Sequence, residues 1–140
     1  MSLENIDARG PRFSAVLTTI VLSIALATNS ELLLALQAVV FAIGAIKGPQ
    51  ATPYAAIFRK FVKPRLKSEA KFEDLRPPQF AQRVGFGFTI VAIAGLLFAP
   101  ALATIAVSFA LAAAFLNAAF NFCLGCEIYV RIARFRAKKA

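Results

Sequence analysis

The chain has 140 residues, of which 59% are apolar, and its 16 Lys and Arg against 7 Asp and Glu give a net charge of +9. Apolar bulk combined with this much basic charge is typical of a membrane protein in which the two are separated along the chain. The pattern argues against a nucleic-acid partner, because a soluble binder would spread its basic residues over helices that have a polar face. Histidine is absent, and with it the commonest metal ligand and general base, so we expect no cofactor and no metal site within one chain.

Four apolar segments, at about residues 13–28, 32–46, 84–99 and 101–129, predict four transmembrane helices. The first three are shorter than the roughly 20 residues that cross a bilayer core, but Arg12 and Arg83 precede two of them and can extend toward the head groups. A soluble bundle would need a polar stripe on each helix, and the second segment offers only Gln37. We therefore expect an all-α integral membrane protein, a single domain over residues 1–140, with four spans arranged as two helical hairpins.

The cations indicate the orientation. All 16 precede the first segment, lie in the central loop at 47–83, or follow the last segment: Arg9 and Arg12; Lys47, Arg59, Lys60, Lys63, Arg65, Lys67, Lys71, Arg76 and Arg83; Arg131, Arg134, Arg136, Lys138 and Lys139. The connections at Asn29–Glu31 and around Pro100 have none. Because positive residues resist translocation, both termini and the central loop are predicted to be cytoplasmic.

A short sequence echo relates the two halves of the chain. Gly-Pro11-Arg-Phe13 leads into the first apolar segment, and Pro-Pro78-Gln-Phe80 leads toward the third. With an even number of spans in each half, this pattern predicts a parallel repeat.

The central loop, which we expect to be cytoplasmic, contains a predicted basic amphipathic helix at 53–67. Its apolar residues recur at spacings of three and four, with cations between them: Tyr54, Ile57, Phe58, Phe61 and Val62. Next to membrane spans, such a helix is expected to bind the anionic surface of the inner leaflet. A sharper alternative is that the basic loop gathers a small anion such as a sulfur oxyanion.

The two cysteines form a CxxC motif, Cys123 and Cys126, at the end of the last apolar segment. On a helix this spacing places both sulfurs on one face, with Glu127 one turn after Cys123 on the same side. We expect the motif to close a helix, where the dipole and Glu127 disfavour a thiolate, and only the nearby Arg residues or a helix break at Asn117 or Asn121 would restore it. The pair is then expected to react with an activated partner, as substrate or relay, rather than as a strong catalyst alone. We also expect a reducing compartment that disfavours a permanent disulfide.

Three interpretations of the pair remain open. Cys123, Cys126 and Glu127 are catalytic candidates for thiol or sulfur chemistry, the cysteines are small packing residues, or they share a metal with ligands from another chain. Asn117 and Asn121 are predicted to face away from the cysteines, where they bond to a neighbouring helix or line a polar pathway.

An ordered set of short motifs covers nearly the whole chain: Asp7-Ala-Arg-Gly-Pro-Arg-Phe13, Gly48-Pro49, Pro53-Tyr54, Phe58-Arg59, Val62-Lys-Pro-Arg-Leu66, Pro77-Pro-Gln-Phe-Ala-Gln82 and Cys123-Leu-Gly-Cys-Glu-Ile-Tyr129. This set resembles the bacterial membrane family catalogued as domain of unknown function 4395. The resemblance implies a small integral membrane protein whose relatives, mostly actinobacterial, are often encoded near thioredoxin-like proteins and sulfurtransferases, and it supplies no established reaction. The site candidates that it implies are Arg9, Arg12, Arg59, Arg65, Gln82, Cys123, Cys126 and Tyr129.

The main hypothesis is thus a multi-pass protein of the bacterial cytoplasmic membrane. Its Cys123 and Cys126 would serve thiol redox or sulfur transfer with a thioredoxin-like or sulfurtransferase partner. A second hypothesis is transport of a small sulfur species or another solute past Gln37, Asn117 and Asn121. A third is a non-catalytic subunit of a membrane complex or homo-oligomer, because short Ala-rich spans offer close-packing surfaces.

Overall fold

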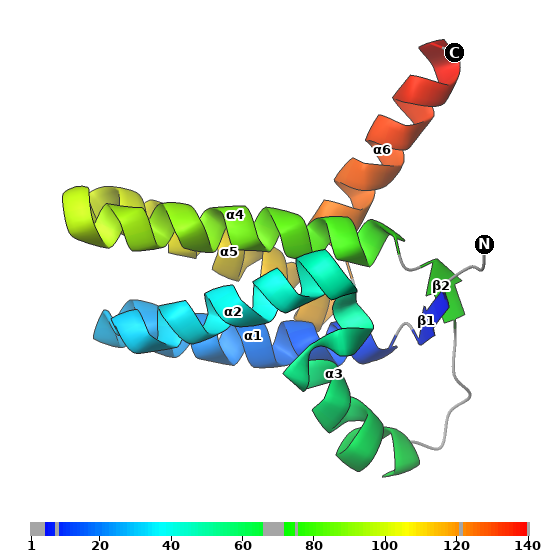
Figure 1. Ribbon diagram of the computed structural model, residues 1–140, viewed down its shortest axis with the longest axis horizontal. Coiled ribbons are helices and arrows are strands. Elements are labelled where there is room, and N and C mark those ends of the chain that lie inside the picture. Colours follow the sequence, from blue (N-terminus) through cyan, green and yellow to red (C-terminus); the bar gives the residue numbers. More distant parts are fainter. Residues whose placement is uncertain (1–4, 8, 66–71, 75, 121, 140) are drawn as a thin grey trace.

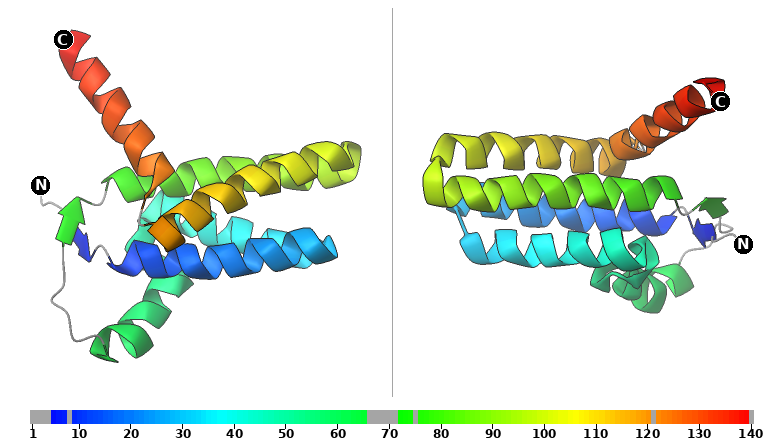
Figure 2. Two further views of the ribbon diagram at one scale, coloured as in Figure 1. Left: turned by 180° about the vertical axis from the view of Figure 1, so that it is seen from behind. Right: turned by 45° about the horizontal axis from the view of Figure 1, so that its top comes forward.

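The computed structural model describes residues 5–7, 9–65, 72–74, 76–120 and 122–139. Four long helices form a bundle (Figure 1): α1 (Arg9–Thr28), α2 (Glu31–Lys47), α4 (Arg76–Phe98) and α5 (Pro100–Phe120). Helices α3 (Pro53–Ile57) and α6 (Leu124–Lys139) project from one end of the bundle on opposite sides, as Figure 2 shows from two further directions. The chain is mainly helical, as predicted.

The long helices are joined by short connections at the end of the bundle opposite to α3 and α6 (Figure 1). Between α1 and α2, Asn29 adopts a positive φ of 55°, which Asn tolerates better than most residues. Ser30 then caps α2 by accepting a hydrogen bond from the Leu33 N–H at 3.2 Å. Between α4 and α5 a single residue intervenes, and Pro100 begins α5, where its missing N–H and fixed φ are favourable.

The packing order of the bundle places α1 diagonally opposite α4. Each of these two helices packs against both α2 and α5, and in Figure 1 they run in the same direction while α2 and α5 return. Glycine permits the closest approach between α4 and α5, because a Cβ at Gly95 would lie only 2.6 Å from the Ala103 nitrogen. The apolar core lies between the four helices and includes Leu22, Leu34, Ala92, Ala106, Val107 and Ala110.

The outer surface of the bundle is also apolar, as expected for a helix surrounded by lipid. Leu32, Ile46 and Phe98 are 79%, 78% and 85% exposed. Among the described helices, three are long and apolar enough to cross a membrane: Arg9–Thr28, Pro77–Phe98 and Pro100–Phe120. These features indicate a membrane protein.

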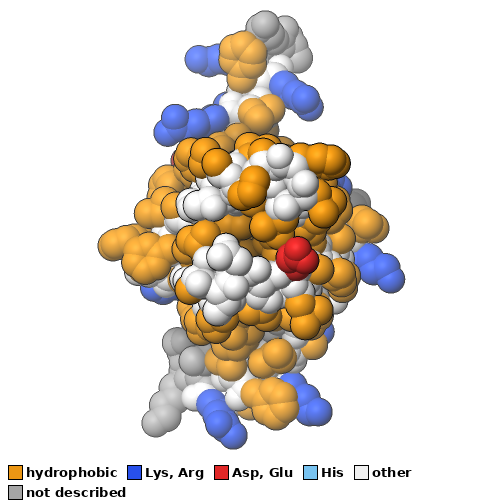
Figure 3. Space-filling view, turned by 90° about the vertical axis from the view of Figure 1, so that its left-hand side faces the viewer, with side chains coloured by type: hydrophobic (Ala, Val, Ile, Leu, Met, Phe, Trp, Pro, Cys, Tyr) orange, Lys and Arg blue, Asp and Glu red, His pale blue; other side chains and the backbone are white. Residues whose placement is uncertain are grey.

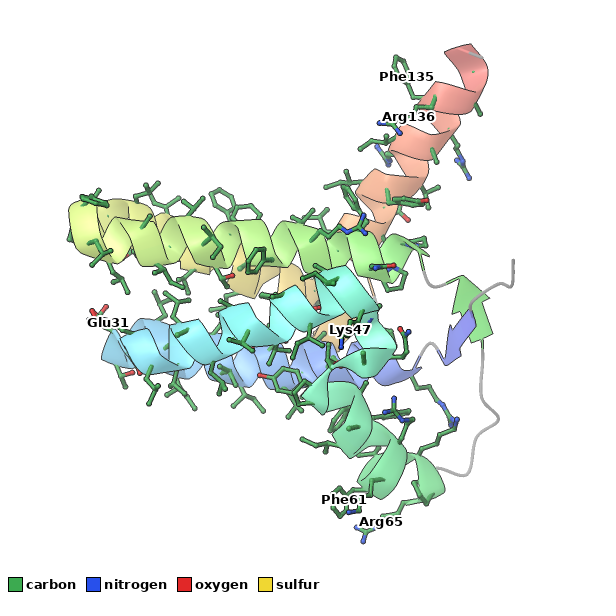
Figure 4. All side chains as sticks on the ribbon, in the orientation of Figure 1. Glu31, Lys47, Phe61, Arg65, Phe135 and Arg136 are labelled. Atoms are coloured by element: carbon green, nitrogen blue, oxygen red, sulfur yellow. A yellow bond between two sulfur atoms is a disulfide. The ribbon has the colours of Figure 1, made fainter. Side chains whose placement is uncertain are left out.

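Cations lie at one end of this apolar body. Viewed from the connections at the opposite end, the bundle presents apolar and uncharged surface with an acidic group, and the basic side chains project at its outline, at the top along α6, at the bottom on the α3 side and at the right-hand edge (Figure 3). Figure 4 likewise places Glu31 at one end of the bundle and Lys47 at the other. The charge separation inferred from the sequence is therefore also a separation in space.

The predicted amphipathic helix exists, but part of its apolar face is occupied by the bundle. The chain is helical from Pro53 through Arg65, with α3 followed by a π-helical turn at Phe58–Val62 and a 3₁₀ turn at Lys63–Arg65. Tyr54 and Phe58 are 9% and 3% exposed, and the Phe58 ring lies 5.8 Å from that of Phe13 on α1. Ile57 and Phe61 remain exposed, so the surface left for lipid is narrower than the spacing alone predicted.

The last apolar segment is not one continuous helix. The sequence predicted a segment over 101–129, whereas α5 ends at Phe120 and α6 begins at Leu124. Helix α6 turns away from the bundle (Figure 1) and carries the cations at its far end, among them Arg134 and Arg136. Charged residues are costly in hydrocarbon. The change of direction between α5 and α6 keeps the basic segment away from the apolar bundle and so from the hydrocarbon around it.

A short antiparallel strand pair was not predicted. Strand β1 (Asn5–Asp7) pairs with β2 (Phe72–Asp74), with Asn5 opposite Asp74 and Asp7 opposite Phe72. A single residue separates each strand from the long helix that follows it, α1 or α4. The pair therefore brings together the chain segments that lead into the two diagonal helices.

Candidate functional site

The CxxC motif opens a helix rather than closing one, which corrects the sequence-based expectation. Cys123 is the residue before α6. Its Sγ accepts a hydrogen bond from the Cys126 N–H at 3.2 Å, and its carbonyl accepts one from the Glu127 N–H at 3.0 Å. Cys123 is thus the N-cap of α6, with Cys126 at the third helical position. The two cysteines form a disulfide, with Cα atoms 5.1 Å apart.

The position at the helix N-terminus changes the expected chemistry of Cys123. The partial positive charge of the first turn stabilises an anion there, and cysteines at helix N-termini are the ones that act as thiolates. The argument that the dipole disfavours thiolate was wrong because it placed the motif at the opposite end of a helix. Glu127 lies in the first turn of α6, and its carboxylate is 4.0 Å from the Arg131 Nε, with both side chains largely exposed.

A cavity of about 310 Å³ adjoins the motif. It is bounded mainly by α1, α4, α5 and the start of α6, and its lining is mostly apolar, with Pro78, Phe88 and Phe109 among the contributors. Ser14, Thr18, Gln82 and Asn117 are polar members of the lining, and Cys123 lies on the wall together with Leu124 and Gly125. The volume falls at the lower end of the range of about 300–1,000 Å³ for small-molecule pockets.

The cavity brings together three of the predicted site residues, Gln82, Asn117 and Cys123. Asn117 was predicted to lie on a different face from the cysteines, and that expectation is wrong. It assumed one continuous helix, whereas the break after Phe120 turns Cys123 back toward the same cavity that Asn117 lines. Asn121 lies outside the described residues.

Gln82 carries a buried polar atom that has no partner in the described part of the chain. Its Oε1 is buried and has no hydrogen-bond partner among the described residues. The side chain packs against Gly44 of α2, where an added Cβ would lie 2.6 Å from the Gln82 Oε1. A buried amide oxygen without a donor is costly, and no hydrogen bond to this oxygen holds the amide in place.

The predicted arginine candidates are divided between two places. Arg12 lies near the cavity end of α1 and donates from Nε to the Ala118 carbonyl in the last turn of α5, at 3.2 Å; Arg9 begins the same helix. Arg59 donates to the Gln50 carbonyl at 2.7 Å, and Arg65 is exposed at the end of the helical segment after α3. In Figure 4, Arg65 and Phe61 project on the side opposite to Arg136 and Phe135.

Tyr129 packs rather than contacting the cysteines' cavity. Its ring lies 5.6 Å from the ring of Phe80, at an angle of 50°. The contact holds α6 against the beginning of α4, which gives Tyr129 a role in positioning the helix that Cys123 caps.

A buried polar network that reaches the cavity lining through Thr18 was not predicted. Gln37 of α2 is 0% exposed; its Nε2 donates to the Thr18 Oγ1 at 3.4 Å, and its Oε1 accepts from the Tyr54 hydroxyl at 2.7 Å. Burial raises the pKa of Tyr54 above its ordinary value, so the hydroxyl stays protonated and remains a donor. The sequence signal was a lone Gln within an apolar segment.

Within the described part of the chain, no group of three or more His, Cys, Asp and Glu residues could hold a metal ion. Cys123 and Cys126 place a disulfide at a helix N-terminus, beside an apolar pocket that has a few polar groups.

Comparison with known families agrees with the resemblance found in the sequence motifs. The model of the family described as Domain of unknown function (DUF4395) matches residues 6–134, and the chain belongs to this family. Neither a curated protein nor a solved structure matches the chain.

Proposed function

We propose that this chain is a thiol-disulfide exchange protein of the bacterial cytoplasmic membrane, with Cys123 and Cys126 as its reacting pair. The observation that carries the proposal is the placement of Cys123 at the N-cap of α6, with its Sγ accepting the Cys126 N–H at 3.2 Å. This arrangement stabilises the thiolate that exchange requires. The partner would be a soluble thioredoxin-like protein or a sulfurtransferase, as the resemblance implies.

The exchange is written with the protein in its disulfide form. A thiolate of the partner attacks the Cys126 Sγ, a bond forms between these two sulfurs, and the Cys123–Cys126 bond breaks with its electron pair on Cys123. Cys123 is the favoured leaving group because the helix N-terminus stabilises its thiolate, and a better-stabilised thiolate leaves faster. A second thiolate of the partner then releases Cys126, so that the partner gains a disulfide and this protein gains a dithiol.

The proposed topology has four spans in two helical hairpins, with both termini and the site in the cytoplasm. It is supported by the location of Lys47, Arg59 and the α6 cations at one end of the apolar bundle, and of Glu31 at the other. Helix α2 has 17 residues, so it would cross with help from its flanks. The exposed Ile57 and Phe61, with Lys60 beside them, would contact the anionic inner leaflet.

The decisive experiment traps the partner in native membranes. In Cys123→Ser the Cys126 thiolate attacks the disulfide form of the partner, the reverse of the exchange written above, and no Cys123 thiolate is present to resolve the mixed disulfide. This species should therefore accumulate, and it is released by reductant and identified by mass spectrometry. Cys126→Ser should trap far less, because Cys123 is not the sulfur that bonds to the partner. An impermeant maleimide should label the reduced pair only after the cells are opened.

The matched control is Cys123→Thr with Cys126→Ala, which keeps a capping side chain and removes both sulfurs. It should trap nothing. Equal trapping by the two single variants would contradict the assigned roles, and no trapped species from either would favour a packing role. Loss of solute uptake in Asn117→Ala, with exchange intact, would instead support transport.

A further inference from the structure

The cavity beside the cysteines is not used by the exchange reaction. Exchange with a soluble partner needs only one accessible sulfur, and Cys126 is not among the residues that line the cavity, whereas Cys123 is. The two sulfurs therefore have different neighbours: Cys123 borders a space inside the helix bundle, and Cys126 lies one helical turn further along α6. A dithiol formed by exchange also needs an electron acceptor before it can react again.

We propose that the cavity binds the ring of a lipid-soluble quinone, which accepts two electrons from the Cys123–Cys126 dithiol. This inference rests on the proposed exchange function, since only a redox-active pair needs an acceptor. The acceptor must take two electrons and two protons, and it must reach a site walled by three helices that are long and apolar enough to cross a bilayer. A quinone dissolved in the bilayer meets both requirements.

The length and the aromatic lining of the cavity suit a ring ligand. Along α4 the lining runs from Pro78 to Phe88, a rise of about 15 Å at 1.5 Å per residue. Phe88 and Phe109 stack with ring centroids 6.2 Å apart and offer aromatic surface to the ring of a bound quinone. Small-molecule pockets bury most of the ligand's surface against apolar side chains, and a few polar groups fix the orientation of the ligand.

The polar lining suits a ligand whose two ends carry oxygen. Ser14 and Asn117 can donate hydrogen bonds to the carbonyl oxygens of a quinone from α1 and α5. Gln82 can serve both redox states, because its amide donates to a quinone carbonyl and accepts from a hydroquinone hydroxyl when turned over. Its Oε1 is buried beside Gly44 of α2 and has no hydrogen-bond partner among the described residues, so turning the amide toward a ligand breaks no hydrogen bond to that oxygen.

The lining also argues against acceptors that carry phosphate. No Lys or Arg occurs among the described residues that line the cavity, and phosphate groups are normally bound by such cations or by a free helix N-terminus. The N-terminus available here, that of α6, is capped by the Cys123 Sγ. A flavin or nicotinamide nucleotide is thus a poorer fit than a neutral ring.

The electron transfer can be written so that it balances. The Cys123 thiolate attacks a quinone carbon and forms a carbon-sulfur bond. The Cys126 thiolate then attacks the Cys123 Sγ, the disulfide forms, and the carbon-sulfur bond breaks with its electron pair on the ring. The two protons given up by the thiols complete the two hydroxyl groups of the hydroquinone.

The test uses the full chain in lipid nanodiscs, reduced and freed of reductant, with a one-isoprene ubiquinone analogue as the probe. The expected result is one quinone reduced for each dithiol lost, measured by absorbance and by counting thiols after maleimide blocking. Ala114→Phe places a ring in the cavity and should slow quinone reduction by at least roughly 10- to 200-fold, the range that a mismatch of one methylene causes in an apolar pocket. Ala112→Phe, at an exposed position on the same helix, is the matched control and should react normally.

A second readout does not depend on the cavity variant folding well. Cys126→Ser should accumulate an adduct with the mass of one quinone on Cys123, and Cys123→Ser should not. Exchange with a reduced thioredoxin separates the two proposals. If exchange proceeds but wild-type protein reduces no more quinone than Cys123→Thr with Cys126→Ala, the quinone proposal alone is overturned; if neither reaction occurs, both fail. Equal rates in Ala112→Phe and Ala114→Phe would overturn the assignment to this cavity.

Discussion

The two halves of the molecule follow the same plan, with a strand, two long helices and a projecting helix in each. Arg9 and Arg76 begin α1 and α4, Pro11 and Pro78 follow at the same distance, and the strand pair β1–β2 joins the two halves. Arg12 donates to the Ala118 carbonyl near the end of α5, and Gln79, at the position equivalent to Arg12, donates to the Ala45 carbonyl near the end of α2. The short sequence echo therefore corresponds to a repeat of contacts.

The projecting helices repeat as well. Thr52 caps α3 by accepting the Ala55 N–H at 3.2 Å, and Cys123 caps α6 by accepting the Cys126 N–H at the same distance. The aromatic contacts correspond too: Phe13 packs against Phe58 in the first half and Phe80 against Tyr129 in the second. The same N-cap is therefore formed by Thr52 and Ala55 in the first half and by Cys123 and Cys126 in the second.

The difference between the halves explains where the cavity comes from. Gln37 lies ten residues before the end of α2, and Ala110 lies ten residues before the end of α5. Tyr54 and Gly125 occupy the second position of α3 and of α6. The first half fills its interior with the bonded pair Gln37 and Tyr54, whereas Ala110 and Gly125 line the open cavity in the second. Two small residues and two sulfurs distinguish the candidate site from its structural counterpart.

The largest effect on thiol exchange is expected when Cys123 and Cys126 are replaced by the residue types that form the N-cap of α3, Thr and Ala. Cys123→Thr with Cys126→Ala should abolish all thiol exchange, because no sulfur remains. Relative to reduced wild-type protein, the free energy of unfolding should change by less than about 1 kcal/mol, because the N-cap is retained. Activity and thermal unfolding of purified protein measure both. A large loss of free energy of unfolding would show that the two cysteines are packing residues. Thr52 and Ala55 would then not be their equivalents in the first half.

The next effect compares the two glutamines through substitutions of matched size. Gln37→Met removes the partner of the buried Tyr54 hydroxyl and should cost about 1–3 kcal/mol. Gln82→Met removes an amide whose Oε1 has no partner among the described residues, and it should be neutral or stabilising. Denaturant or thermal unfolding in detergent compares the two. Equal losses would mean that Gln82 is bonded as Gln37 is and is not available to a ligand.

Elements whose sequence pattern extends over many residues could be predicted, and short elements could not. Apolar segments and cation positions identified the long helices and the charged end of the bundle, because burial and charge act along whole segments. The predicted helix starting near Pro53 was found for the same reason. Strand β1 has three residues, too few for an alternating pattern to stand out, and its pairing depends on a partner 67 residues away.

The sequence supplied candidate residues but not their arrangement. Cys123, Gln82 and Asn117 were all named as candidates, yet their meeting at one cavity depends on the break between α5 and α6. A helix break at Asn117 or Asn121 was only an alternative to one continuous helix, because composition alone does not separate one long helix from two. A cysteine used as a cap is also harder to recognise than Thr52 in the same role, since Ser, Thr, Asp and Asn are the usual signals.

The smallest effects should come from the repeated contacts at the helix starts. Gln79→Ala removes a part-buried hydrogen bond to the Ala45 carbonyl at 3.0 Å and should cost about 1 kcal/mol. Arg12→Ala removes an exposed bond to the Ala118 carbonyl at 3.2 Å and should cost about 0.5 kcal/mol. Thermal unfolding of the single and double variants measures both losses, and they should add, because the residues are on diagonal helices and share no partner. Strong coupling between them would mean that the two halves form one network rather than two copies of the same contact.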